Sequence, residues 1–247
     1  MDIRVKDFFT DYNTVDSQNE LPPMFVDGIL RMADSMARGT DLGVYVFDYT
    51  KKAVIYVSPK IAQWCNIRPS DIMANGNDSY LKYINEDDLQ MLLTINQAVF
   101  KFLKGLPDSE SMTYVVSYDF RYGKLMVNQH YTPVLVKDGK VLMAVCIVSL
   151  SASKASGNIT MDSPKSRYSY EYSLQENKWI KKKKIHLSDR EKEIIRLSAQ
   201  GLTTTQIAEL TQKQEATIKS QKRSLFHKLG VHSIAEAIRL TMNNGLL

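Results

Sequence analysis

The spacing of hydrophobic residues divides the chain into a helical N-terminal leader, a strand-rich middle and a helical C-terminal segment. Two apolar stripes with helical spacing occur within residues 1–40. The first stripe consists of Val5, Phe8, Phe9 and Tyr12, and the second of Phe25, Ile29, Met32 and Met36. The second stripe follows two prolines that favour a helix start, and its residues should face inward. The leader is expected either to cover its own domain or to pair with a second copy of itself.

Residues 41–152 change to the two-residue alternation that is typical of strands. Segments 43–48 and 53–57 predict a hairpin, because a four-residue turn separates them. A short helix is expected from Ser58-Pro59 through Cys65, loop and short helix over 71–83, and a longer helix over 89–103. Three acidic residues precede the longer helix and complement its N-terminal dipole. Three further strands are predicted at 112–122, 124–136 and 140–150, with Asp138-Gly139 as a hairpin turn.

Residues 185–247 predict four short helices, because their start and stop signals recur at helical spacing. Ser188 with Glu191 and Thr203 with Gln206 form capping boxes, in which each side chain hydrogen-bonds the other residue's backbone N–H. Gly201 is a natural stop for the first helix. The third helix ends at Leu229-Gly230-Val231, and Ser233 with Glu236 caps the fourth. Four short helices with a basic third one predict a helix-turn-helix unit.

The third helix, 215–229, has one apolar and one basic side. Ile218, Leu225 and Leu229 line one side, whereas Lys219, Arg223 and His227 point to the other. Taken alone, such a pattern is more typical of a solvated basic face. However, residues 181–247 contain 13 Lys and Arg against 6 Asp and Glu, whereas residues 1–180 contain 19 against 21. Positive charge confined to one segment indicates a polyanionic partner for that segment.

The C-terminal residues resemble the LuxR-type DNA-binding domain, in order and in spacing. The matching positions are Leu187, Arg190, Glu191, Glu193, Gly201, Gln206, Ile207, Ala208, Thr217, Ile218, Lys219, Lys228, Leu229, Gly230 and Val231. The chain departs from the family pattern at Thr211, Lys213 and Gln214, where the turn into the third helix lacks the usual apolar residues and Ser cap. That turn should be less well capped and less well packed. Gln221 stands where a phosphate-binding His is common.

The resemblance implies a role for particular residues in binding double-stranded DNA. Base edges in the major groove should be contacted by Lys219, Ser220 and Arg223, and phosphates by Thr204, Thr217, Gln221 and Lys228. Domains of this family bind inverted repeats as dimers, so a homodimer is expected, with the last helix, Ile234 to Met242, as the partner surface. RNA polymerase is a further candidate partner.

The middle segment, 41–152, looks like a PAS domain, because the order of strand pair, short helices, long helix and three strands is the same. The phrases VSPKIAQWCNI and YINEDDLQMLL are similar to the family's hinge-like and loop motifs. The resemblance implies an α+β protein: an antiparallel PAS-like sheet domain followed by an all-α four-helix domain. A PAS sheet curls around a pocket that holds a small molecule or haem or is filled by side chains, so it leaves the cofactor open.

Residues 153–184 are predicted to be a linker that ends in a ribbon. The stretch up to Ser166 is rich in Ser, Gly and Lys. Tyr168, Tyr170 and Tyr172 then alternate with polar residues, and Trp179 and four lysines follow, which predicts two strands with one aromatic face. An isolated ribbon is marginal in water, so it should pack on the DNA-binding domain or on the PAS-like sheet. The alternative is a relay between domains, with Lys181 to Lys184 touching the DNA backbone.

Several functions are disfavoured by missing motifs. The context of flavin-adduct cysteines is absent around Cys65, which favours a buried structural thiol, and His130 is more typical of a packing residue than of a haem ligand. The pocket motif of acyl-homoserine-lactone receptors and the aspartate set of a phosphoacceptor domain are also missing. No phosphate loop, metal cluster or catalytic triad supports an enzyme. A sigma-factor-like promoter recognition protein remains the alternative, although the strand-rich middle speaks against it.

The expected compartment is cytoplasmic. Only two cysteines occur, Cys65 and Cys146, which argues against a disulfide scaffold. The longest apolar run, from Val141 to Leu150, is too short to span a bilayer, and no apolar leader opens the chain. The sequence therefore predicts a soluble protein without a membrane partner.

Overall fold

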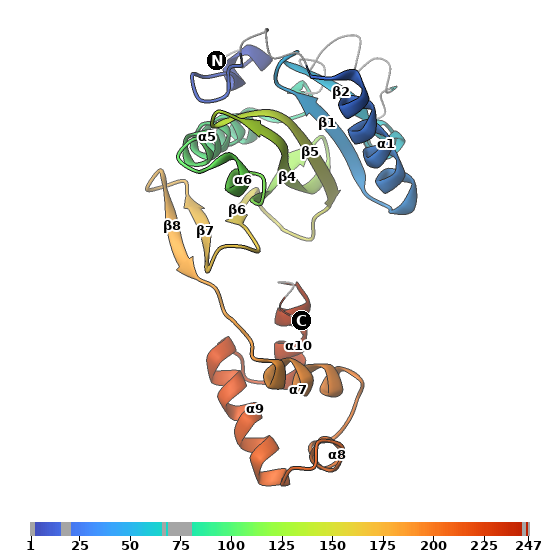
Figure 1. Ribbon diagram of the computed structural model, residues 1–247, viewed down its shortest axis with the longest axis vertical. Helices are drawn as coiled ribbons and strands as arrows, with labels where there is room; N and C mark the ends of the chain where they lie inside the picture. The colour runs from blue at the N-terminus through green and yellow to red at the C-terminus, as the bar shows by residue number, and fades with distance from the viewer. Residues whose placement is uncertain (1–2, 16–20, 66–67, 69–80, 244–245, 247) are drawn as a thin grey trace. The chain divides into compact units, whose positions relative to one another are not determined.

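The computed structural model describes residues 3–15, 21–65, 68, 81–243 and 246. Its chain divides into two compact units, Met1–Lys182 and Lys183–Leu247 (Figure 1). Most of the predicted loop and short helix at 71–83 lies outside the described residues. Within the described parts, no helix is long and apolar enough to cross a membrane.

The N-terminal unit is built on one antiparallel sheet. Its helices are the 3₁₀ helix η1 (Val5–Phe8), α1 (Pro23–Gly39), α2 (Pro59–Cys65), α5 (Glu86–Leu103) and α6 (Asp108–Ser111). Its strands are β1 (Gly43–Asp48), β2 (Ala53–Val57), β3 (Val115–Tyr122), β4 (Leu125–Lys137), β5 (Lys140–Leu150), β6 (Gly157–Asp162), β7 (Tyr168–Ser173) and β8 (Lys178–Lys183). The strands follow one another in the order β2-β1-β5-β4-β3-β6-β7-β8. The first five in this order form the predicted PAS-like sheet.

Local signals explain the start of α5 and the turn between β4 and β5. The side chain of Asn85 accepts a hydrogen bond from the Asp88 backbone N–H (2.8 Å) and caps α5. A carboxylate oxygen of Asp88 accepts from the Arg121 backbone N–H (2.8 Å), which ties the helix to β3. Asp138 and Gly139 both have positive φ, as a two-residue hairpin turn of the predicted kind requires.

The two faces of the sheet bury different side chains, because successive residues of a strand point to opposite faces. On one face, Val44 and Val46 of β1 and Met143 and Val145 of β5 pack together with α1. On the other face, Tyr45, Phe47 and Cys146 point toward a cavity beside α5. Both faces of the central strands are therefore covered by the chain itself.

The prediction that all four apolar residues of the second stripe face inward is wrong for two of them on α1. Its buried residues are Ile29 and Ala33, which contact the sheet. Phe25 and Met32, which we expected to face inward, are 41% and 46% exposed. The buried stripe of α1 is therefore narrower than the apolar stripe of its sequence. The leader thus covers its own sheet, and it also leaves apolar side chains in solvent.

The segment that we expected to be a linker contains a strand. β6 pairs with β3, from Val115 opposite Asp162 to Asp119 opposite Gly157, and β7 pairs with β6. β7 and β8 form the predicted aromatic ribbon. The ribbon packs against α5, where the rings of Phe102 and Tyr170 lie 4.9 Å apart. The ribbon thus packs on the sheet domain, which is one of the two predicted packing partners.

The C-terminal unit consists of α7 (Asp189–Ala199), α8 (Thr204–Leu210), α9 (Glu215–Leu229) and α10 (Ile234–Asn243). Both predicted capping boxes are formed, at Ser188 with Glu191 and at Thr203 with Gln206. One apolar cluster joins α7, α9 and α10 around Ile194, Ile195 and Leu225, and a smaller cluster joins α8 and α9. The four-helix domain and the antiparallel sheet domain confirm the predicted fold class.

Two glycine substitutions should have opposite effects on stability. A Cβ at Gly43 would lie 2.6 Å from Cγ1 of the buried Ile61, whereas a Cβ at Gly28 on α1 would meet nothing within 4 Å. We expect Gly43→Ala to lower the free energy of unfolding by about 1 to 3 kcal/mol through overpacking. Gly28→Ala should raise it by up to about 1 kcal/mol through helix propensity. Urea unfolding of both variants measures the two effects, and equal effects would contradict the packing argument.

Candidate nucleic-acid interface and ligand cavity

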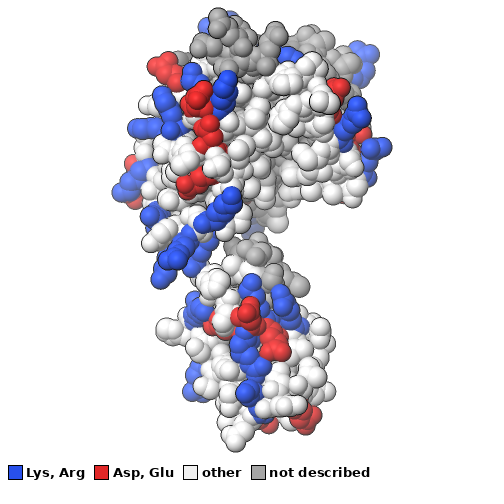
Figure 2. Space-filling view, viewed as in Figure 1, with Lys and Arg blue, Asp and Glu red and all other residues white. Residues whose placement is uncertain are grey.

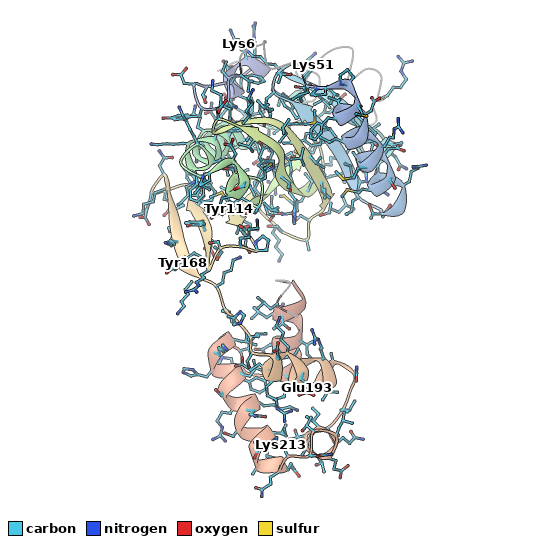
Figure 3. The ribbon with its side chains drawn as sticks, viewed as in Figure 1. Lys6, Lys51, Tyr114, Tyr168, Glu193 and Lys213 are labelled. Atoms are coloured by element: carbon cyan, nitrogen blue, oxygen red, sulfur yellow. The ribbon has the colours of Figure 1, made fainter. Side chains whose placement is uncertain are left out.

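Helix α9 is held by its apolar stripe and by the turns at its ends. Ile218, Leu225 and Leu229 are buried, as the sequence predicts. The helix ends at Gly230, whose φ of +66° allows the left-handed C-cap. At the other end the N-cap residue is Gln214, which forms no side-chain capping hydrogen bond. Lys213, labelled in Figure 3, precedes this uncapped start and is exposed.

The outward side of α9 presents Lys219, Ser220 and Arg223, all of them exposed. Lys219 already forms an ion pair, because its ammonium lies 2.6 Å from a carboxylate oxygen of Glu215 on the previous turn. The Lys219 ammonium lowers the pKa of that carboxyl, and a hydrogen bond from Thr205 contributes further. Among the residues that the structure describes, Arg223 has neither an ion pair nor a hydrogen-bond partner. Its guanidinium is therefore available to a ligand.

The flank of α9 that faces α7 is occupied by contacts within the domain. Gln221 is half-buried and accepts a hydrogen bond from Nε of Arg190 (3.4 Å). The same guanidinium donates to Oγ1 of Thr211 (3.1 Å) and pairs with Glu193 (2.7 Å). Arg190 therefore joins α7, the turn after α8 and α9. Gln221, which we expect at a phosphate, also makes this contact within the domain.

Lys228 and Glu191 form a second contact between α9 and α7. The Lys228 ammonium lies 2.8 and 3.0 Å from the two carboxylate oxygens of Glu191. Burial raises the pKa of the Glu191 carboxyl, but hydrogen bonds from Lys228 and from the capped Ser188 outweigh burial, so the pKa is lowered. Thr217 also lies on this flank and is half-buried. The flank thus carries three of the predicted phosphate-binding residues.

The opposite flank of α9 contains a residue that the sequence analysis missed. Lys222 is half-buried, and its ammonium donates to Oγ1 of Thr204 at the start of α8 (3.2 Å). Burial lowers the pKa of Lys222. Lys222 follows the buried Ile218 by four residues, and this spacing already places it beside the apolar stripe. Thr204 of α8 is thus hydrogen-bonded to α9 by Lys222, which was predicted neither as a base-contacting nor as a phosphate-contacting residue.

The charges of the C-terminal unit are mixed rather than uniformly basic. Figure 2 shows a run of Lys and Arg side chains on the visible face of this unit, with acidic side chains beside it. Glu193, labelled on α7 in Figure 3, pairs with Arg190. Internal pairing leaves fewer free cations than the sequence count suggests.

The N-terminal unit encloses a cavity of about 160 Å³ between the sheet and α5. Its wall is mainly aromatic and aliphatic, and no Asp, Glu, Lys, Arg or His is among the described residues that line it. The lining residues are Phe8, Phe9, Tyr45, Phe47, Tyr49, Val54, Val57, Ile61, Leu81, Leu92, Ile95, Asn96, Val99, Phe100, Val116, Tyr118, Phe120, Gln129, Tyr131 and Cys146. The described residues elsewhere bring no group of three His, Cys, Asp or Glu side chains together for a metal ion.

The polar groups of the cavity wall are neutral. Burial raises the pKa of the Tyr49 and Tyr131 hydroxyls, which interact with each other, and raises the pKa of the Cys146 thiol to about 12. The side-chain amide of Gln129 donates to the hydroxyl of Tyr118. Against these described residues, an ionised ligand group would meet hydroxyl and amide dipoles without a compensating charge, so its burial would be costly.

Residues 8 and 9 close one side of the cavity and are held by a buried asparagine. Asn13 donates to the Phe8 carbonyl (2.8 Å) and accepts from the Thr10 backbone N–H (2.6 Å). Phe9 packs near Phe47, with 6.1 Å between the ring centroids. The N-terminal segment is therefore part of the cavity wall.

His130 and Cys65 were also assigned roles from the sequence. His130 lies on β4 but is exposed, so it is not the packing residue that we expected. The side chain of Cys65 lies outside the described residues, whereas Cys146 is a buried free thiol. Cys146 therefore has the structural environment that we expected for Cys65.

Helices α7 to α10 have the order of a helix-turn-helix unit, in which α9 follows the short turn after α8. Residues 186–241 match the family described as bacterial regulatory proteins, luxR family. The match covers the C-terminal unit and less than a quarter of the chain.

Other comparisons cover different parts of the chain. Over 61 residues the chain is 39% identical to the Fimbriae Z protein of Salmonella typhimurium, which is 25% of this chain and 29% of that protein. The chain thus matches less than a third of the length of this curated relative. A phage VqmA–DPO complex (14% identity, 90% of this chain and 88% of that one, TM-score 0.34) and Escherichia coli SdiA (14%, 93% and 94%, 0.28) are also similar. These TM-scores are too low to establish a shared overall arrangement.

Capping α9 should stabilise the C-terminal unit. Gln214 has the extended backbone (φ −73°, ψ 144°) that an N-cap residue adopts, but its side chain makes no cap. We expect Gln214→Ser to raise the free energy of unfolding by about 0.5 to 2 kcal/mol, because the Ser hydroxyl can accept from a free backbone N–H. Thr203→Ala, which removes an existing cap, is the matched control and should lower it by a similar amount. No gain for Gln214→Ser in chemical denaturation would contradict the assignment of a weak turn.

Proposed function

We propose that the protein is a sequence-specific DNA-binding transcriptional regulator, in which α9 reads the DNA major groove. The observation that carries this proposal is the exposed, unpaired Arg223 beside Ser220 on the third helix of a luxR-family domain. An arginine can donate two parallel hydrogen bonds to guanine, the commonest specific contact in the major groove. Lys219 is placed to join them if its ion pair with Glu215 opens.

The phosphate-contacting set is proposed to flank this reading face. Thr204, at the start of α8, lies beside one flank of α9, and Thr217 lies on the other flank. Lys228 can exchange its partner Glu191 for a phosphate. Gln221 is bonded to Arg190, so we assign it to phosphate contact only through the free part of its amide. Such contacts fix the position of a protein on DNA and carry no sequence information.

A homodimer is part of this proposal. Paired reading helices match the two halves of an inverted repeat. The last helix, α10, remains the proposed partner surface, and the exposed Met24, Phe25 and Met32 of α1 offer a second apolar surface. The sigma-factor-like alternative predicts co-purification with core RNA polymerase, and its absence would remove that alternative.

The cavity is proposed to hold a small neutral molecule. Its volume of about 160 Å³ is close to that of an engineered cavity of about 150 Å³ that binds benzene. The hydroxyls of Tyr49, Tyr118 and Tyr131 and the amide of Gln129 supply polar contacts. A ligand with one ring and one or two polar groups fits both the size and the chemistry.

Arg223→Ala should reduce sequence discrimination by about 1 to 3 kcal/mol at one base pair, because the bidentate contact is lost. The measurement is competition between a DNA site selected by the wild-type chain and random duplex. Arg196→Ala, which removes one exposed charge from α7, is the control and should leave discrimination unchanged. Equal discrimination by Arg223→Ala and wild type would refute the reading role of Arg223.

Phenol should raise the melting temperature of the protein, whereas benzoate at the same millimolar concentration should not. Both molecules carry one ring, but the carboxylate of benzoate would be buried without a compensating charge. Val99→Phe fills part of the cavity and should abolish the effect of phenol. A shift with benzoate equal to that with phenol would contradict a neutral ligand.

A further inference from the structure

The ribbon formed by β7 and β8 has one face that changes from aromatic to cationic along its length. Because side chains alternate along a strand, Tyr168, Tyr170 and Tyr172 lie on one face of β7. Trp179, Lys181 and Lys183 lie on one face of β8 in the same way. Ring contacts between Tyr172 and Trp179 (5.0 Å) and between Tyr168 and Lys181 show that these two faces coincide.

The aromatic end of this face is fixed to α5. The indole N–H of Trp179 donates to the Ala98 carbonyl (3.3 Å), and the Trp179 ring lies 6.1 Å from that of Phe102. The ring of Phe102 also contacts Tyr170. These contacts attach the Trp179 and Tyr170 end of the ribbon to α5.

The other end of the same face carries uncompensated positive charge. The Lys181 ammonium lies 3.8 Å from the centroid of the Tyr168 ring. Tyr168, labelled in Figure 3, is 39% exposed. Lys183 is exposed, and no other residue that the structure describes forms an ion pair with it. A cation over an aromatic ring keeps its charge and remains open to an anion on its other side.

The lysines on the opposite face are already paired. Lys178 pairs with Glu176, and Lys182 pairs with Glu171. The alternation of the strand therefore sorts neutralised lysines to one face and free lysines to the other. Strand β8 therefore offers two pairs of lysines with equal charge, Lys178 with Lys182 and Lys181 with Lys183.

We propose that the phosphate-binding face, defined as Tyr168, Lys181 and Lys183, contacts the DNA backbone outside the site that α9 reads. This inference rests on the proposed function and extends it. Only residues 184–188 connect β8 to α7, so these lysines share a short stretch of chain with the reading unit. Lysines act as point charges for phosphates, so the contact adds affinity regardless of base sequence.

The chemistry of the ribbon favours DNA over an anionic membrane surface. Membrane-surface segments combine basic and apolar side chains so that the apolar ones can enter the bilayer. Here the exposed Ile180 lies on the face opposite to Lys181 and Lys183. A backbone of regularly spaced phosphates requires no apolar insertion, and two lysines on one face of a strand, two residues apart, can reach neighbouring phosphates.

The test compares two double variants of the full chain, Lys181→Gln/Lys183→Gln and Lys178→Gln/Lys182→Gln. Binding to a duplex selected by the wild type and to a random duplex is measured over a range of salt concentrations. Loss of two phosphate contacts should reduce the slope of log K against log salt by about 1.8 in magnitude, on both duplexes. The control pair removes the same charge from the paired face and should change the slope much less. Thermal unfolding checks that both variants remain folded.

The outcomes separate this inference from the proposed function. An unchanged slope for Lys181→Gln/Lys183→Gln, or equal losses in both double variants, overturns the phosphate-binding face and leaves sequence-specific reading by α9 intact. A reduced slope together with no preference for any selected duplex supports the phosphate-binding face and overturns sequence-specific reading. Loss of binding to phosphatidylserine vesicles with an unchanged DNA slope assigns the lysines to a membrane and overturns the inference.

Discussion

The burial of β5 on both faces is the constraint on which the N-terminal unit depends. Met143 and Val145 point to the side covered by α1, whereas Ala144 and Cys146 point to the side of α5. Apolar surface left in water costs about 25 cal/mol per Å², so neither face of the strand can remain uncovered. The two helices are therefore both required. The cavity lies on the α5 side, where rings and helix enclose a space that the side chains do not fill.

The C-terminal unit meets a different constraint, because a unit of its size has a small core. Its buried side chains fall into two clusters, one around Ile194 and Leu225 and one around Ile207 and Ile218. Small domains bury a smaller fraction of their surface, so polar contacts between helices matter more for their geometry. Arg190 contacts α7, Thr211 and α9 at once, and Lys228 joins α9 to the first turn of α7. The direction of α9 thus depends on two polar contacts as well as on its apolar stripe.

The sequence predicts features that are determined by neighbouring residues and misses those that are determined across the fold. Capping at Ser188 and Thr203 and the turn at Asp138-Gly139 depend on residues within a few positions, and all three are present. The exposure of Phe25 depends on how much of the sheet α1 covers, and the pairing of β6 depends on the free edge of β3. No local pattern contains this information. In the candidate interface, the helix and its outward residues follow from periodicity, but the partner of Gln221 lies 31 positions away.

These internal contacts limit which side of α9 can serve the proposed DNA reading. A helix of this kind has apolar, flanking and outward sides, and here both flanks form bonds within the domain. Rotating α9 toward a base would break the hydrogen bonds of Arg190 and Lys222, which hold the helix from opposite sides. In the proposed DNA-reading role, base contacts come from the outward side, where Ser220 and Arg223 are exposed and where Lys219 is paired with Glu215. The start of α9 lacks a side-chain cap at Gln214, but the buried Ile218 and the hydrogen bond from Thr205 to Glu215 hold it against α8. The orientation of α9 is therefore set by contacts near its start as well as along its flanks.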